Sequence, residues 1–107
     1  MTIKHWERAD IVRWHKSTFP HCSADEQLKK LAEEAKEYYL STTPAEKLEE
    51  AADVYIAATV LWRRYGEPLG NEMCVYISGR HADIMSAVDC KMAVNTKRAW
   101  KNNRHVA

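Results

Sequence analysis

The segment AADVYIAATVLW, from Ala51 to Trp62, limits the possible folds more than any other part of this sequence. It is long enough for about three helical turns, and Asp53 is its only charged residue. A helix that is apolar on every side is buried by its neighbours. We therefore predict that this segment is the central helix of a bundle, and the position of Asp53 requires an explanation.

The rest of the sequence also favours helices over strands. The chain has only three Gly and three Pro, and apolar residues recur at three- and four-residue spacing almost throughout its 107 residues. We predict an all-α fold of four to five helices in a single domain, residues 1–107. A domain of this size buries only about 60–70% of its unfolded surface, so we expect oligomerisation to complete the bundle.

Start and stop signals divide the chain into these helices. Ser23 and Glu26 form an S-x-x-E capping box, which predicts a helix beginning at the next residue after Ser23. Thr43 can cap the following helix, Pro44 suits its first position, and Gly66 is placed to end it. The predicted helices span residues 3–17, 24–40, 44–65, 69–78 and 80–101.

Short loops and helical spacing predict the packing. The loop at residues 41–43 is short, so the helices on either side are expected to be antiparallel neighbours. One such hairpin leaves Ile56, Val60 and Trp62 incompletely covered, and we therefore expect a homodimer or a dimer of dimers. Trp62 and Trp100 are assigned to packing. The other predicted core residues are Trp6, Ile11 and Trp14 in the first helix, and Leu28, Leu31, Ala32, Ala35 and Tyr39 in the second.

Composition excludes several classes of protein. Lys and Arg total 16 and Asp and Glu total 15, which argues against a general nucleic-acid binder. No apolar run approaches 18 residues, and the N-terminal residues have no apolar signal core, so we expect no membrane partner. The three cysteines lack C-x-x-C spacing, so a disulfide scaffold or a zinc site is not expected. These features favour a cytoplasmic protein.

Five carboxylates lie at helical spacing on the two helices of the predicted hairpin. Glu33, Glu34 and Glu37 share one side of the first helix, and Glu50 and Asp53 are three residues apart on the second. Two like charges at 4 Å repel by about 4 kcal/mol at an effective dielectric near 20, so converging carboxylates need raised pKa values or a divalent cation. Oxygen ligands suit Mg²⁺ or Mn²⁺ rather than Zn²⁺.

The alternative interpretation is a solvated helix face. Clusters such as Glu46, Glu49 and Glu50 are common on exposed helices, and the acidic residues of the preceding helix can be one as well. Asp53 is harder to explain in this way because its neighbours are apolar on all sides, although it lies in the first half of its helix.

The two clusters together read E-E-x-x-E, twelve residues, then E-x-x-D. This pattern resembles the MazG-like superfamily of all-α nucleoside triphosphate pyrophosphohydrolases. The segments FPHCSADEQLKKLAEEAKEYY and KMAVNTKRAWK are also similar to the helices that enter the metal site and close the fold in that superfamily. The resemblance covers residues 14–101.

The resemblance implies hydrolysis of a (deoxy)nucleoside triphosphate to the monophosphate and pyrophosphate, with Mg²⁺ as cofactor and Mn²⁺ as a substitute. It implies Glu34, Glu37, Glu50 and Asp53 as metal ligands. Glu33 matches the leading Glu of the motif, which holds a further metal or orients the attacking water. Glu33 and Glu34 are therefore our candidate catalytic residues.

Candidate nucleotide-binding residues come from both ends of the chain. Lys91, Asn95 and Arg98 follow i, i+4, i+7 spacing on one face of the last helix, where Lys and Arg are expected phosphate partners. Trp14 and Phe19 precede the first acidic cluster and are candidates for contact with the base. The alternatives are a solvated basic face and two ordinary core aromatics.

Three functions follow from these residues. The first is a Mg²⁺-dependent nucleoside triphosphate pyrophosphohydrolase that cleans the nucleotide pool. The second keeps the same chemistry and takes phosphoribosyl-ATP as its substrate. The third is a non-catalytic helical interaction module whose carboxylates are only solvated.

Overall fold

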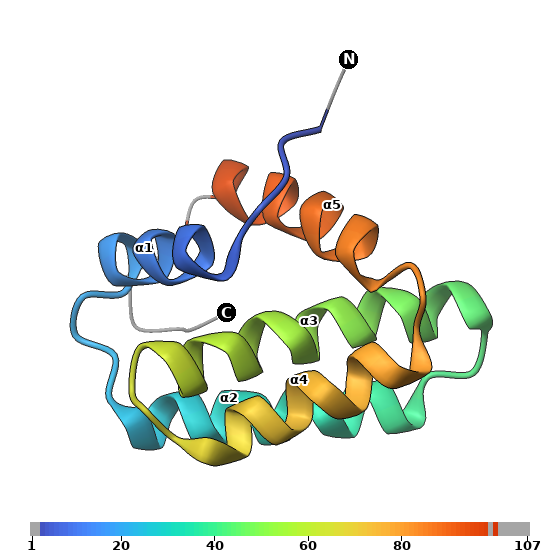
Figure 1. Ribbon diagram of the computed structural model, residues 1–107, viewed down its shortest axis with the longest axis horizontal. Helices are drawn as coiled ribbons and strands as arrows, with labels where there is room; N and C mark the ends of the chain where they lie inside the picture. The colour runs from blue at the N-terminus through green and yellow to red at the C-terminus, as the bar shows by residue number, and fades with distance from the viewer. Residues whose placement is uncertain (1–2, 99, 101–107) are drawn as a thin grey trace.

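The computed structural model describes residues 3–98 and Trp100. Over these residues the chain is all-α, as the sequence predicts, and it has five helices and no strand (Figure 1). The two predicted helices at the hairpin are found almost as expected, since one is matched in full and the other ends two residues early. The helices are α1 (Arg8–Thr18), α2 (Ala24–Leu40), α3 (Pro44–Arg63), α4 (Pro68–Arg80) and α5 (Ile84–Lys97).

Helix α3 is the centre of the molecule. Every residue from Val54 to Leu61 is buried, and each of the other four helices packs on α3. In Figure 1, α2 and α4 lie on one side of α3, whereas α1 and α5 lie on the other. The prediction of a buried central helix is confirmed.

The cover over α3 comes from this chain itself. Ile56 is 1% exposed and Val60 is 0% exposed in the single chain, and Trp62 is partly buried. The argument that these residues need a partner subunit is therefore wrong, because α1, α4 and α5 supply what the hairpin alone lacks. The homodimer or dimer of dimers stays a prediction, and it now rests only on the small size of the domain.

Local signals fix the helix ends. Ser23 and Glu26 form the predicted capping box at α2, and the Thr43 hydroxyl accepts the N–H of Glu46 at α3. Gly66 has a φ of 73°, a left-handed conformation that glycine adopts at low cost, and it follows the end of α3.

The first and last helices differ from the prediction. Helix α1 begins at Arg8 because Glu7 and Asp10 form a capping box, and the residues before it lie along α5, where Asp89 accepts the N–H of Trp6 at 2.8 Å. Helix α5 is shorter than predicted because α4 continues to Arg80. The predicted end of the last helix, residue 101, lies outside the described residues.

The inner face of α2 is also different from the predicted one. Its buried residues are Gln27, Leu31 and Glu34, and the Gln27 amide donates to the Ala57 carbonyl of α3 at 3.0 Å. Hydrophobic periodicity missed this face because two of its three buried residues are polar. Leu31 was predicted correctly, and Ala35 is partly buried. Three residues that were predicted to be buried are exposed: Leu28, Ala32 and Tyr39.

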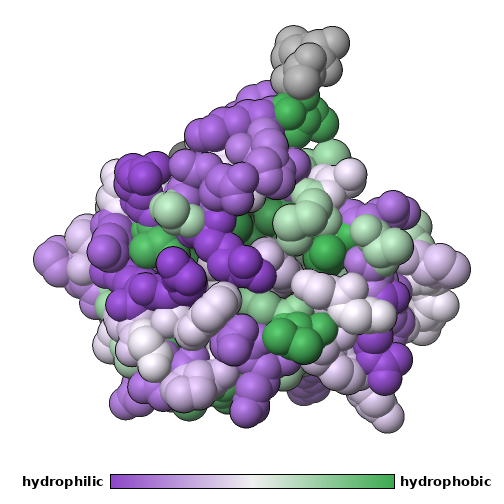
Figure 2. Space-filling view, viewed as in Figure 1, coloured by the Kyte–Doolittle hydropathy of each residue, from purple (hydrophilic) through white to green (hydrophobic). Residues whose placement is uncertain are grey.

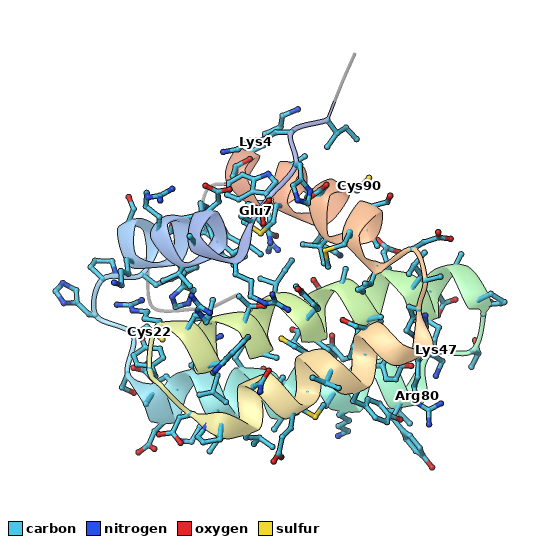
Figure 3. All side chains as sticks on the ribbon, viewed as in Figure 1. Lys4, Glu7, Cys22, Lys47, Arg80 and Cys90 are labelled. Carbon is cyan, nitrogen blue, oxygen red and sulfur yellow. The ribbon has the colours of Figure 1, made fainter. Side chains whose placement is uncertain are left out.

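The surface is largely hydrophilic on the face that Figure 2 shows, with apolar residues in small separate groups. Among the described residues, no helix has both the length and the apolar character that crossing a membrane requires. The three cysteines are free thiols, and Figure 3 shows Cys22 and Cys90 far apart on the molecule.

Candidate metal and anion site

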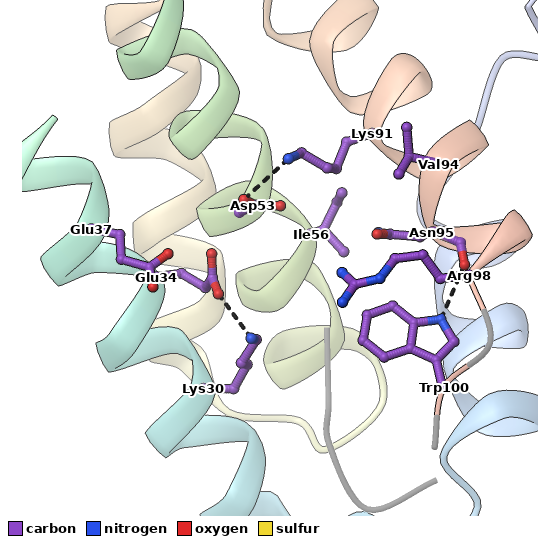
Figure 4. A pocket seen from close by; sticks show the side chains of 10 residues that line it. All are labelled: Lys30, Glu34, Glu37, Asp53, Ile56, Lys91, Val94, Asn95, Arg98 and Trp100. Atoms are coloured by element: carbon purple, nitrogen blue, oxygen red, sulfur yellow. Dashed lines mark hydrogen bonds and ion pairs between the residues drawn. The ribbon is translucent and has the colours of Figure 1, made fainter. Parts of the chain in front are cut away.

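A pocket of about 250 Å³ lies between α2, α3 and the C-terminal end of α5 (Figure 4). One side of it is acidic, with Glu34 and Glu37 from α2 and Asp53 from α3. The remaining lining residues are basic or largely apolar, and only Asn95 among them is polar and uncharged. They are Lys30, Lys91 and Arg98, then Ile56, Val94, Asn95 and Trp100.

Three carboxylates meet beside this pocket. Glu34, Glu50 and Asp53 each offer an oxygen atom, and these atoms all lie within 4.8 Å of one another. Glu50 and Asp53 point the same way because they are three residues apart on α3. The hydrogen bond from Gln27 to the Ala57 carbonyl fixes α2 against α3 one turn beyond Asp53 and so sets the position of Glu34.

Two of these carboxylates have buried oxygens without a hydrogen-bond donor. The Oε2 atoms of Glu34 and Glu50 are inaccessible to solvent and accept no hydrogen bond within the described part of the chain. Glu34 is only 6% exposed. A buried acceptor without a partner costs about 1–3 kcal/mol, and more when it is charged. A divalent cation between the three carboxylates would satisfy both atoms, so the donor set fits such an ion.

The electrostatics of the cluster favour a proton or a cation. Burial raises the pKa of Glu50 to about 7, and the neighbouring carboxylates of Asp53, Glu37 and Glu34 add to the effect. Burial also raises the pKa of Asp53 to about 6, although the nearby Lys91 ammonium opposes the change. Near neutral pH Glu50 is therefore only partly ionised, and a divalent cation would replace its proton.

Basic side chains face the same pocket. Lys30 Nζ lies 2.9 Å from Glu34 Oε1, and Lys91 Nζ lies 3.4 Å from Asp53 Oδ2. The Arg98 guanidinium lies over the Trp100 ring, 4.1 Å from its centroid, and points toward the pocket in Figure 4. Trp100 is itself held by a hydrogen bond of 3.0 Å from its ring N–H to the Asn95 carbonyl.

The structure brings most of the predicted polar site residues together. Lys91, Asn95 and Arg98 all line the pocket, and the buried Asn95 amide lies 3.6 Å from Met92 Sδ. Glu37 is exposed and lines the pocket, but it is not one of the three clustered carboxylates. Glu33 is exposed on α2 and does not line the pocket.

The predicted aromatic contacts lie behind the pocket. Phe19 is 0% exposed, and neither it nor the partly buried Trp14 lines the pocket. Both rings pack edge-on against Trp100, at centroid distances of 5.2 Å and 6.2 Å. Trp100 was assigned to packing but lines the pocket. The signals for it in the sequence are its place two residues after Arg98 and its part in the segment KMAVNTKRAWK.

Lys30 also lines the pocket, although it is not among the predicted site residues. It lies four residues before Glu34 on the same face of α2, so the sequence allows either an intrahelical pair or contact with a phosphate. Only the folded chain shows that Lys30 lines a pocket, because the packing of α5 over α3 forms that pocket.

No family model, curated protein or solved structure matches this chain.

Proposed function

We propose that this protein is a Mg²⁺-dependent hydrolase that converts (deoxy)nucleoside triphosphates to the monophosphate and pyrophosphate. The observation that supports the proposal is the meeting of three carboxylates from two helices beside a pocket that Lys30, Lys91 and Arg98 also line. The resemblance of the E-E-x-x-E and E-x-x-D motifs to the MazG-like superfamily agrees with this arrangement.

The balance of charge supports a polyanionic substrate that binds together with a metal. Four carboxylates against three cations leave the site with a formal charge of −1 when all groups are ionised. Such a site repels a triphosphate, and one divalent cation changes its charge to +1. Oxygen-only donors suit Mg²⁺ or Mn²⁺.

Each group of residues has a role in this proposal. When bound, the metal neutralises phosphate oxygens and lowers the pKa of a coordinated water. Glu34, Glu50 and Asp53 would hold it, and Lys91 and Arg98 would bind phosphate oxygens from the opposite wall. Glu37 lines the pocket outside the three clustered carboxylates, and in this proposal it accepts a proton from the attacking water. Glu33 lies outside the pocket and is a weaker candidate for that role.

Trp100, Ile56 and Val94 provide the surface for the nucleoside. They are the apolar part of the pocket wall, and a base needs a flat apolar surface with a few hydrogen bonds. Trp14 and Phe19 would then support this surface from behind, through their contacts with the Trp100 ring.

Release of pyrophosphate from a panel of NTPs and dNTPs, with Mg²⁺ and with EDTA, tests the proposal. The panel includes phosphoribosyl-ATP, because turnover of that compound alone would favour the second function. Asp53→Asn should abolish turnover, and Glu72→Gln, which removes one exposed carboxylate from α4, should not. Failure of every compound in the presence of Mg²⁺ would refute the enzyme and leave the interaction module.

A further inference from the structure

Both lysines of the pocket are paired with carboxylates that are candidate metal ligands. Lys30 contacts Glu34 at 2.9 Å, and Lys91 contacts Asp53 at 3.4 Å and Glu49 at 3.7 Å. In Figure 4 the two ammonium groups approach the acidic cluster from different sides. Without a cation, the positive charge beside the cluster is supplied by the chain itself.

These pairs are not ordinary surface ion pairs. The four side chains are only 8–27% exposed, so they are screened less by water and salt than exposed pairs are. The order of Lys30 and Glu34 along α2 is also the less favourable one for an i, i+4 pair. Stabilisation of α2 by this pair therefore does not explain well why a lysine stands at position 30. Neutralisation of the negative charge in the pocket explains it better.

We propose that Lys30 and Lys91 neutralise Glu34 and Asp53 in the metal-free protein and transfer to substrate phosphates when a divalent cation occupies the cluster. Cation and triphosphate then bind with positive cooperativity. This inference rests on the proposed function and adds a control mechanism to the same site.

The physical reason is competition for the same carboxylate oxygens. A cation among Glu34, Glu50 and Asp53 repels both ammonium groups, and each lysine has a flexible four-carbon stem that lets it turn away. An anion in the pocket gives the displaced ammonium groups a new partner. By thermodynamic linkage, the anion then strengthens cation binding by the same factor.

Arg98 is different from the two lysines. Its guanidinium is stacked on Trp100 and has no carboxylate partner among the described residues, so the cation does not displace it. Arg98 therefore contributes to phosphate affinity with or without the metal. Only the two lysines connect phosphate affinity with metal occupancy.

The first test is Mn²⁺ titration of the whole chain without any anion, with free Mn²⁺ measured by electron paramagnetic resonance. Lys30→Gln and Lys91→Gln should each bind Mn²⁺ about five- to thirtyfold more tightly than wild type, because a competing ammonium group is gone. Lys29→Gln is the matched control. It removes the same charge from the neighbouring exposed position, does not alter the pocket lining, and should bind Mn²⁺ like wild type.

The second test uses inorganic tripolyphosphate, which has the phosphate charge without a base. Its affinity is followed by tryptophan fluorescence, since Trp100 lines the pocket. Mg²⁺ should tighten its binding to wild type and to Lys29→Gln, and this gain should be at least fivefold smaller in the two pocket variants. Circular dichroism confirms that each variant is folded.

The outcomes separate the two proposals. Wild-type Mn²⁺ binding with unchanged or weaker binding in both pocket variants overturns the lysine transfer and leaves the metal site in place. Absence of Mn²⁺ binding in wild type and in all variants overturns the metal site, and the lysine transfer with it.

Discussion

Asp53→Asn should stabilise the metal-free protein while it destroys the site. Burial holds the pKa of Asp53 at about 6 against an ordinary value of 3.8, and each pH unit of that difference is worth 1.36 kcal/mol, or about 3 kcal/mol in total. The Asp53 side chain is 24% exposed, and screening by solvent reduces this figure to about 1–2 kcal/mol. Removal of the charge should raise the free energy of unfolding by that amount.

The size of this effect depends on pH. The folded-state pKa of Asp53 is raised, so its contribution to stability is complete below pH 3.8 and is lost as the pH rises through 6. Thermal melts with EDTA should therefore show Asp53→Asn about 5–10 °C above wild type at pH 8 and a smaller gap at pH 5. Glu72→Gln should follow wild type at both values. A variant that melts below wild type at pH 8 would refute the reasoning.

Three further predictions concern other residues. The raised pKa of Glu50, about 7, should make the metal-free melting temperature fall between pH 6.5 and 8, and this fall should exceed the smaller opposite effect of His15, whose pKa burial lowers to about 3 and whose unfolded state loses its remaining proton in that range. Mg²⁺ should remove this fall, and its persistence would contradict the metal site. Gly70→Ala would place a Cβ in steric conflict with the Ala58 carbonyl oxygen and should cost about 1–3 kcal/mol in chemical denaturation, whereas Gly79→Ala has open space and should be neutral or stabilising. Trp100→Ala should raise KM for nucleotides more than it weakens tripolyphosphate binding, and equal effects would exclude contact with the base.

Much of the fold could be predicted from local sequence. The capping residues Ser23 and Thr43 and the left-handed Gly66 fix the ends of two helices through contacts with their own neighbours. The unbroken apolar segment identifies α3 as the central helix. Such signals act over a few residues, and they do not depend on how the helices pack.

The rest depended on contacts between distant residues. The inner face of α2 contains Gln27 and Glu34, whose burial is explained only by the Ala57 carbonyl and by the acidic cluster across the helix pair. Asp89 determines the path of the N-terminal residues from more than 80 positions away. Neither contact can be predicted from the spacing of the hydrophobic residues.

The sequence predicts some residues of the candidate site and misses others. Contacts between distant residues are again the reason. Motif spacing identified Glu34, Glu50 and Asp53, because Glu50 and Asp53 are three residues apart on α3 and the short hairpin allows Glu34 of α2 to face them. It also predicted Glu37 as a metal ligand and Glu33 as a catalytic residue, yet Glu37 lines the pocket outside the three clustered carboxylates and Glu33 does not line it. A rotation of a few tens of degrees about the α2 axis decides which of the two reaches the pocket. Trp100 follows α5, and only the folded chain shows its ring at the pocket wall.

The most direct test of the account is a crystal structure of the protein soaked with Mn²⁺, with the ion located by anomalous scattering. We predict an anomalous peak between the carboxylates of Glu34, Glu50 and Asp53, with the Lys91 ammonium moved away from Asp53. Clear density for these side chains with no peak between them, or with Mn²⁺ bound only at exposed carboxylates such as Glu33, would contradict the metal site and the chemistry proposed from it.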